Sequence, residues 1–194
     1  MRILGVDEAG RGPLAGPVAV GVVMADEGFD FLSAFPGLND SKKLSEKKRE
    51  ALFELLLACD KVSFRVKSVD AATIDKAGIA KAVRSSVHAG IRDLAPEPMG
   101  VRVYLDGSLS GPEEYEQETV IGGDALIPAI MLASVAAKVT RDRLMVRLSE
   151  EYPEYDFAKH KGYGTPAHQD AIRKFGLCDL HRRSFCRSFL STPS

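Results

Sequence analysis

Hydrophobic residues along the chain gather in several short runs that have the length and composition of β-strands. Residues 2–7 and 16–25 are apolar and rich in Val, Leu and Ala, which predicts two buried strands. Residues 61–69 alternate hydrophobic and polar side chains, as a half-exposed strand does. Residues 101–105 predict a further strand, which Asp106-Gly107 terminates.

Helical spacing of hydrophobic residues marks much of the chain between and after these strands. Ser41 or Ser45 can cap a helix that runs to about Cys59. One face of this helix is predicted to carry Leu52, Phe53, Leu56 and Leu57.

The later part of the chain is predicted to be mainly helical. A helix is expected over residues 78–94, and Pro128 suits the first turn of a long helix that reaches about Glu150. Residues 152–166 are rich in Pro, Gly and Tyr and predict a loop. Two short basic helices are expected over 167–175 and 179–189. Strands that alternate with helices predict an α/β protein.

Length and composition indicate one globular domain over residues 1–194, with 45% hydrophobic and 27% charged residues. The longest uncharged stretches, 12–25 and 125–137, are too short for a membrane span, so no membrane association is expected. The charged residues near the N-terminus predict no secretory leader. The three cysteines lack metal-binding spacing and are expected to be reduced thiols of a cytoplasmic protein; they are Cys59, Cys178 and Cys186.

The formal net charge of -1 argues at first against a nucleic-acid partner, but the charges are segregated along the chain. Residues 106–126 contain six acidic residues and no Lys or Arg. Residues 41–50 carry five basic residues against two acidic ones, and residues 155–194 carry seven against three. This pattern is compatible with an acidic metal centre flanked by phosphate-binding surfaces. Solvated helix faces of mixed charge are the alternative.

The acidic residues that follow the predicted strands are candidate metal ligands. Asp7 and Glu8 end one strand, Asp106 ends another, and Asp124 precedes the long helix. Adjacent carboxylates raise each other's pKa unless a cation lies between them. Oxygen ligands without nearby His or Cys suit Mg²⁺ or Mn²⁺ better than Zn²⁺. From spacing alone, Asp-Gly as a simple turn and Asp7-Glu8 as a helix cap remain open.

The amino-acid sequences of five segments are more informative about function than the spacing of the acidic residues. The opening Gly-Val-Asp-Glu-Ala-Gly-Arg-Gly-Pro-Leu-Ala-Gly-Pro-Val closely resembles the start of ribonuclease HII, the type 2 ribonuclease H family. Four later segments resemble the same family in the expected order. The five segments are Gly5–Val18, Leu38–Leu44, Tyr104–Gly107, Ala133–Asp142 and His160–Thr165.

The resemblance implies an RNase H-like fold, a mixed central sheet flanked by helices, with a small helical C-terminal extension over about residues 166–194. It also implies an endonuclease that cleaves the RNA strand of RNA/DNA hybrids and cuts 5′ of single ribonucleotides in duplex DNA. Carried over by position, the metal-binding catalytic carboxylates would be Asp7, Glu8, Asp106 and Asp124. They would hold two divalent ions, Mn²⁺ or Mg²⁺, and leave 3′-hydroxyl and 5′-phosphate ends. Asp142, on the predicted long helix, is the alternative fourth carboxylate.

Substrate contacts are also implied by the resemblance. Gly10, Arg11 and Gly12 would lie at the ribonucleotide, where a backbone without Cβ atoms can approach the 2′-hydroxyl. Tyr163 would stack on the sugar of the neighbouring deoxynucleotide. Candidate phosphate contacts come from matching segments and are Lys42, Lys43, Lys138 and Lys161.

Some basic residues could have either a functional role or an ordinary surface position. His160 and His168 could assist protonation of the leaving group, but a surface position is the simpler expectation. Arg182, Arg183 and Arg187 at helical spacing could extend a nucleic-acid surface or form a solvated face. The terminal residues 191–194 show no clear interaction motif.

Two other functions compete with a monomeric nuclease of the ribonuclease HII type. The first is a catalytically weak hybrid-binding protein of the same fold, against which the presence of all four carboxylates argues. The second is ribonuclease HIII, for which an additional N-terminal domain would be expected before Asp7.

Overall fold

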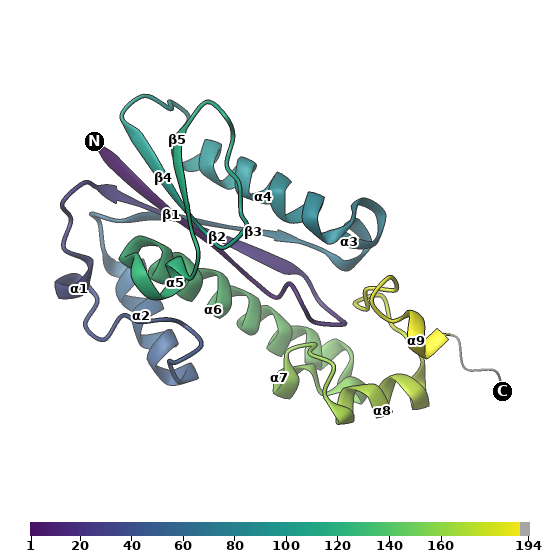
Figure 1. Ribbon diagram of the computed structural model, residues 1–194. Coiled ribbons are helices and arrows are strands. Elements are labelled where there is room, and N and C mark those ends of the chain that lie inside the picture. Colours follow the sequence, from purple (N-terminus) through teal and green to yellow (C-terminus); the bar gives the residue numbers. More distant parts are fainter. Residues whose placement is uncertain (191–194) are drawn as a thin grey trace.

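The computed structural model describes residues 1–190 (Figure 1). Its strands are β1 (Arg2–Ala9), β2 (Val18–Asp26), β3 (Ser63–Val69), β4 (Val101–Asp106) and β5 (Glu116–Val120). Its helices are α1 (Phe31–Ala34), α2 (Glu46–Ala58), α3 (Ala71–Ala77), α4 (Ile79–Leu94), α5 (Gly123–Leu126), α6 (Pro128–Glu151), the 3₁₀ turn η1 (Pro153–Tyr155), α7 (Phe157–His160), α8 (Pro166–Phe175) and α9 (Arg187–Leu190). The expectation about residues 191–194 lies outside the described part of the chain.

The five strands form one mixed sheet in the order β3-β2-β1-β4-β5. β2 runs antiparallel to both β1 and β3, whereas β1, β4 and β5 run parallel to one another. The parallel arrangement brings the carboxyl ends of β1 and β4 to the same edge of the sheet. A mixed sheet flanked by helices confirms the predicted α/β fold.

Helices cover both faces of the sheet, so its central strands are buried on both sides (Figure 1). Val20 and Val22 of β2 belong to the hydrophobic cluster that includes α4, whereas Val23 belongs to the cluster with α2 and α6. Successive residues of a strand point to opposite faces, which explains this division. The run 16–25 is therefore continuously apolar instead of alternating.

Glycines on the central strands let α6 lie close against the sheet. A Cβ atom at Gly5 of β1 would lie 2.2 Å from the backbone carbon of Ala129, and one at Gly21 of β2 would lie 2.2 Å from the carbonyl oxygen of Ala133. Real Cβ atoms do not approach other atoms so closely, so larger residues would push α6 outward. This close packing fixes the start of α6 against Gly5, in the middle of β1.

Helix boundaries follow the predicted signals closely. The Ser45 hydroxyl, and not that of Ser41, accepts a hydrogen bond from the Lys48 amide and caps α2. Pro128 occupies the first turn of α6, as predicted. Leu52, Phe53 and Leu56 are buried, but the prediction that Leu57 shares their face is wrong, because its side chain is exposed.

Three segments differ from the sequence prediction. Residues 152–166, expected as a loop, contain the 3₁₀ turn η1 and the short helix α7. The acidic stretch between β4 and α6, expected as a loop, contains the edge strand β5, which carries acidic side chains on its exposed positions. The helix expected over residues 179–189 is replaced by turns, an isolated bridge between Ala15 and His181, and the short α9. The helix expected over 167–175 is present as α8.

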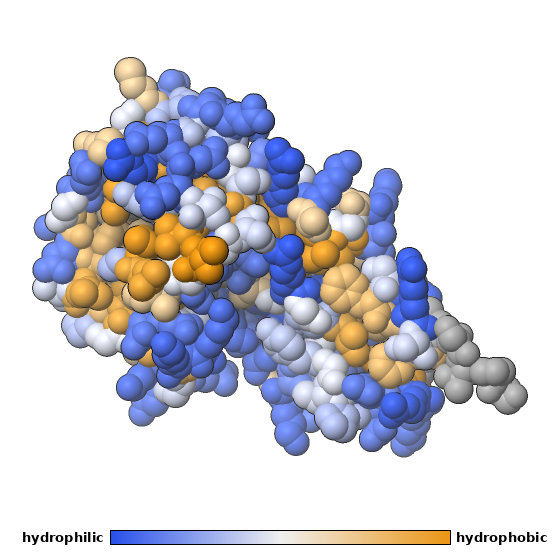
Figure 2. Space-filling view, in the orientation of Figure 1, coloured by the Kyte–Doolittle hydropathy of each residue, from blue (hydrophilic) through white to orange (hydrophobic). Residues whose placement is uncertain are grey.

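The surface in the orientation of Figure 1 is mostly hydrophilic, with one group of hydrophobic residues around α5 (Figure 2). Leu126 at the end of α5 and Ile121 just before this helix are among the exposed large hydrophobic residues. Within residues 1–190, we find no helix that combines the length and apolar character needed to cross a membrane.

Candidate metal centre and nucleic-acid cleft

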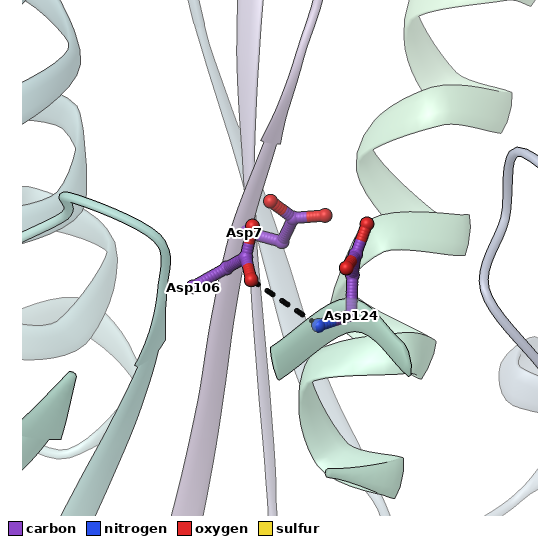
Figure 3. Close-up of side chains that lie close together, drawn as sticks. All are labelled: Asp7, Asp106 and Asp124. Atoms are coloured by element: carbon purple, nitrogen blue, oxygen red, sulfur yellow. Dashed lines mark hydrogen bonds between the residues drawn. The ribbon is translucent and has the colours of Figure 1, made fainter. Parts of the chain in front are cut away.

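Three aspartates from separate segments meet at the carboxyl edge of the parallel strands (Figure 3). Asp7 lies in β1, Asp106 ends the neighbouring β4, and Asp124 lies in α5. One carboxylate oxygen of each residue lies within 4.8 Å of the others. The Asp124 amide also donates a hydrogen bond of 3.2 Å to Asp106 Oδ1, which fixes α5 against the end of β4.

Burial and mutual repulsion disfavour the ionised form of the carboxylates in the aspartate cluster. Burial, together with the negative charges of Glu8 and Asp106, raises the pKa of Asp7 to about 7. A hydrogen bond from Ser134 opposes this rise in pKa. A divalent cation among the three carboxylates would offset both the burial and the mutual repulsion. The cluster offers only oxygen ligands, which fits a hard ion such as Mg²⁺ or Mn²⁺.

Lys42 supplies a positive charge at the edge of the aspartate cluster. Its Nζ donates a hydrogen bond of 2.7 Å to Asp124 Oδ2, and this bond raises the pKa of Lys42. The lysine side chain is largely exposed, whereas the Asp124 side chain is buried. Lys42 can therefore move toward a bound phosphate at little cost in packing.

Glu8 is not part of the aspartate cluster, although it adjoins Asp7 in sequence. Successive side chains of a strand point to opposite faces, so Glu8 is directed away from the Asp7 carboxylate. Glu8 Oε1 accepts a hydrogen bond of 3.4 Å from Arg11. Burial raises the pKa of Glu8, and the Arg11 charge opposes the rise.

Asp142, the alternative fourth carboxylate, lies on α6 and outside the aspartate cluster. Its Oδ1 accepts a hydrogen bond of 2.9 Å from Nζ of Lys138, one helical turn earlier. This ion pair already compensates the buried Asp142 charge. Geometry therefore favours Asp124 as the partner of Asp7 and Asp106.

A cleft of about 260 Å³ opens beside the cluster and is lined by Asp7, Glu8 and Asp106. Most of the residues that the sequence assigned to substrate contact, except Lys43 and Lys161, also line this cleft. They are Gly10, Arg11, Gly12, Lys42, Lys138 and Tyr163. The five segments of the sequence motif thus contribute to one concave surface.

Tyr163 presents an accessible ring at the cleft, with 42% of its surface exposed. Two cations lie near this ring: Lys138 Nζ and Arg141 Cζ are each 5.8 Å from its centroid. An aromatic ring flanked by cations is suited to contact a sugar beside a phosphate.

Arg141 is a buried residue next to Gly10 and Tyr163, and its own role was not predicted from the sequence. Its Nε donates a hydrogen bond of 2.8 Å to the carbonyl of Pro17, and Nη2 donates one of 3.3 Å to the carbonyl of Ala15. Its Nη1 has no hydrogen-bond partner among the described residues. Gly10, with φ of +83°, leaves room for this side chain, because a Cβ there would lie 1.9 Å from Arg141 Nε. The signal was its place in the matching segment, immediately before Asp142.

The expectation that His160 and His168 lie on the surface is wrong, because both side chains are buried. His160 Nε2 donates a hydrogen bond of 2.6 Å to the carbonyl of Tyr155, and His168 Nδ1 donates one of 2.9 Å to the carbonyl of Tyr163. The two imidazole rings stack with centroids 4.4 Å apart. Neither residue lines the cleft.

The prediction of an arginine-rich helix face near the C-terminus is also wrong. Arg182 is fully buried, whereas Arg183 and Arg187 are exposed, and no single helix contains all three residues. Of the further candidate lysines, Lys43 Nζ lies 3.9 Å from Asp40 Oδ2, and Lys161 Nζ donates to the carbonyl of Ala158. Neither of these lysines lines the cleft.

Comparison with known proteins adds a second line of information. The family model for ribonuclease HII matches residues 4–188. The ribonuclease HII of Geobacillus kaustophilus is 46% identical over 185 residues, which cover 95% of this chain and 68% of that protein. The ribonuclease HII of Coxiella burnetii is 44% identical over 185 residues, which cover 95% of this chain and 88% of that protein.

Solved structures give the same result at the level of the fold. The ribonuclease H2 of Pyrococcus horikoshii matches with a TM-score of 0.78 and 26% identity, covering 99% of this chain and 100% of that one. The ribonuclease HII of Archaeoglobus fulgidus, solved in a complex with PCNA, matches with a TM-score of 0.78 and 24% identity, covering 94% of each chain. These matches confirm the predicted RNase H-like fold.

Proposed function

Because this chain belongs to the ribonuclease HII family, metal-dependent endonucleases that act on RNA/DNA hybrids, we propose that its aspartate cluster and adjoining cleft form the catalytic centre. The observation that carries the proposal is the approach of three carboxylates within 4.8 Å beside a cleft lined by the motif residues. The proposed reaction is hydrolysis of the RNA strand in RNA/DNA hybrids and cleavage 5′ of single ribonucleotides in duplex DNA.

Asp7, Asp106 and Asp124 are the proposed ligands of the divalent ions. Glu8, which lines the same cleft, is proposed to add a fourth carboxylate to the metal centre. Two ions, Mn²⁺ or Mg²⁺, would supply activation of the attacking water and stabilisation of the leaving 3′ oxygen, giving 3′-hydroxyl and 5′-phosphate products. The side chains themselves provide a rigid ligand frame, because Asp7 is held by the sheet and Asp124 by its amide bond to Asp106.

Selection of the ribonucleotide is assigned to the turn formed by Gly10, Arg11 and Gly12. A Cβ atom at Gly12 would meet no atom within 4 Å, so this glycine faces open space in the cleft. Main-chain groups of the turn can therefore approach a ribose closely and pair with its 2′-hydroxyl. A deoxyribose would leave these groups without that partner.

Tyr163 and two lysines complete the proposed contacts. The accessible ring of Tyr163 would pack on the sugar of the neighbouring deoxynucleotide, which distinguishes an RNA-to-DNA junction. Lys42 and Lys138 would contact phosphates, which position the duplex without reading its sequence. We further propose a monomeric enzyme of the cytoplasm, where three unpaired cysteines are ordinarily reduced.

The proposed function is tested by cleavage of three labelled duplexes: an RNA/DNA hybrid, a DNA duplex with one ribonucleotide, and all-DNA. Each is incubated with Mn²⁺, Mg²⁺ or EDTA. The protein should cut the first two with metal, should cut 5′ of the single ribonucleotide, and should leave all-DNA intact. Asp106→Asn should lower the rate at least about 100-fold, since changes even to residues behind metal ligands cost 10 to 100-fold.

The matched control is Asp170→Asn, which removes an exposed carboxylate paired with Arg173 on α8 and should retain full activity. Cleavage in EDTA, or full activity of Asp106→Asn, would contradict the proposed centre. Tight hybrid binding with no cleavage in either metal would support the hybrid-binding alternative instead.

A further inference from the structure

Two loops that are far apart in the sequence line the cleft, and the same short C-terminal segment holds both. One loop is the turn at Gly10–Gly12, and the other carries Tyr163. The segment that contacts both contains the adjacent residues His181 and Arg182, which lie outside the cleft lining. Both residues are buried, with 2% and 0% of their surfaces exposed.

Arg182 binds the glycine-containing turn through its whole guanidinium group. Nη2 donates a hydrogen bond of 2.6 Å to the carbonyl of Gly10, Nη1 one of 2.8 Å to that of Arg11, and Nε one of 3.0 Å to that of Gly16. Two carbonyls of the turn and the carbonyl of Gly16 thus point at a single planar group. A fork of fixed geometry restricts their positions more than a single-point donor could.

His181 reaches the second loop through His168. The Tyr163 carbonyl can only accept, so His168 Nδ1 donates to it at 2.9 Å and His168 Nε2 accepts. His181 Nε2 is 3.1 Å from His168 Nε2 and must therefore donate. His181 Nδ1 then accepts from the Cys178 amide at 3.0 Å. The hydrogen bonds form one directed chain from Cys178 to Tyr163.

Main-chain contacts connect the same three segments. Ala15 and His181 form an antiparallel bridge, and the Arg182 amide donates a hydrogen bond of 2.8 Å to the carbonyl of Leu14. The Leu14 amide in turn donates one of 2.9 Å to the carbonyl of Gly162, next to Tyr163. Displacement of the C-terminal segment would therefore shift both loops together.

We propose that His181 and Arg182 are positioning residues that fix the Gly10–Gly12 turn and Tyr163 relative to each other, and so set recognition of the RNA-to-DNA junction. This inference rests on the proposed function for the role of the two loops. The pair acts through these loops and does not touch the aspartate cluster. A misplacement of about 1 Å in such a site can lower a rate about 100-fold.

The test uses Arg182→Lys, which keeps the charge but loses the three-point fork, and His181→Phe, which keeps a ring but loses both nitrogen contacts. Arg173→Lys on α8 and His88→Phe on α4 are the matched controls outside the two loops. Hydrogen exchange of the whole 194-residue chain is measured first, without substrate or metal. Arg182→Lys should speed exchange in residues 10–16, and His181→Phe should speed it in residues 162–165.

Steady-state cleavage and Mn²⁺ affinity are then measured on the same proteins. Arg182→Lys should lower kcat on both the hybrid and the single-ribonucleotide duplex by about 10 to 100-fold. His181→Phe should lower cleavage of the single-ribonucleotide duplex more than that of the hybrid, because Tyr163 is assigned to the junction. Mn²⁺ affinity should stay at the wild-type value in both variants.

Several results would overturn the inference. These are exchange in the two loops like that of the controls, unchanged rates on both substrates, or rate losses that match a loss of Mn²⁺ affinity. Should Arg182→Lys not fold, the exchange and substrate ratio of His181→Phe decide alone. If the wild-type protein cuts neither substrate, the proposed function fails. Normal exchange in the variants would overturn the coupling of the loops by itself.

Discussion

Gly10 and Gly12 stand two residues apart in the same turn, yet an added methyl group has different consequences at each. At Gly10, φ is +83° and a Cβ would lie 1.9 Å from Nε of the buried Arg141. At Gly12, a Cβ would meet no atom within 4 Å. The first glycine is required by the fold, whereas the second is assigned to the substrate.

Gly10→Ala and Gly12→Ala should therefore separate stability from recognition. Gly10→Ala should lower the free energy of unfolding by more than about 1 kcal/mol, because alanine is strained at positive φ and collides with Arg141. Gly12→Ala should leave that free energy unchanged but slow cleavage at a single ribonucleotide. Urea unfolding and cleavage rates of both variants check this. Equal destabilisation by the two substitutions would contradict the assignment.

For single residues, the sequence predicts those roles that follow from neighbours along the chain. Asp7 and Asp106 are predictable because each follows a short apolar run in the sequence. The roles of Arg182 and His168 depend on carbonyl groups that only the folded chain brings to them. No local pattern distinguishes such buried side chains from solvated ones.

Among the elements, the contact of α6 with the sheet decides the shape of the metal centre. Gly5 lies two residues before Asp7 on β1, and its missing side chain leaves space for the backbone of Ala129. Since α5 and Asp124 directly precede α6, a shift of α6 also shifts Asp124 relative to Asp7.

Gly5→Ala should thus affect stability and metal binding together. Overpacking of this kind costs about 1–3 kcal/mol, so the free energy of unfolding should fall by at least that amount. Mn²⁺ affinity should fall as well, because the aspartates separate. Urea unfolding and Mn²⁺ titration test this, with Gly12→Ala as the control that changes neither. Loss of stability with intact Mn²⁺ affinity would show that α6 does not set the aspartate geometry.

Elements were predictable where local signals agree with the environment. α6 shows a proline at its start, and β2 is a continuous apolar run buried on both faces. β5 was missed because an edge strand tolerates acidic side chains and carries little hydrophobic signal. Residues 179–189 have helical charge spacing, but Arg182 and the Ala15–His181 bridge bind this segment to the first turn of the chain instead.

For the whole molecule, the buried histidines link stability to pH. Burial, together with the charge on His160, lowers the pKa of both His168 and His181 to about 4. Arg183 also faces His181 and acts in the same direction. Both side chains are therefore neutral in the folded protein at neutral pH.

His168→Phe should reveal this linkage. An unfolded histidine titrates near pH 6.5, so below that pH the unfolded chain takes up a proton that the folded chain resists. The stabilising contribution of neutral His168 is fully present above pH 6.5 and is lost as pH falls toward 4. The difference in unfolding free energy between wild type and His168→Phe should therefore increase from pH 4 to 6.5 and then level off.

The opposite contribution of Asp7, whose pKa is raised, is present in both proteins and cancels in that difference. Urea unfolding of the two proteins between pH 4 and 8 makes the comparison. A difference that is constant or decreases over this range would contradict a buried, neutral His168.

The arrangement of charges over the whole molecule, and not only the net charge, decides which partners the protein can bind. The net charge of -1 combines a carboxylate cluster with basic residues that line the same cleft. Divalent ions in the cluster would neutralise part of the acidic charge and leave Arg11, Lys42 and Lys138 facing the duplex. A nearly neutral total is therefore compatible with a nucleic-acid substrate.

The measurement that tests the central claim most directly is Mn²⁺ binding, followed by electron paramagnetic resonance, to the wild-type protein and to three variants. Wild type should bind Mn²⁺, Asp106→Asn and Asp124→Asn should lose at least about 100-fold in affinity, and Asp142→Asn should bind as wild type does. Wild-type affinity in Asp124→Asn, together with a loss in Asp142→Asn, would contradict a centre built from Asp7, Asp106 and Asp124.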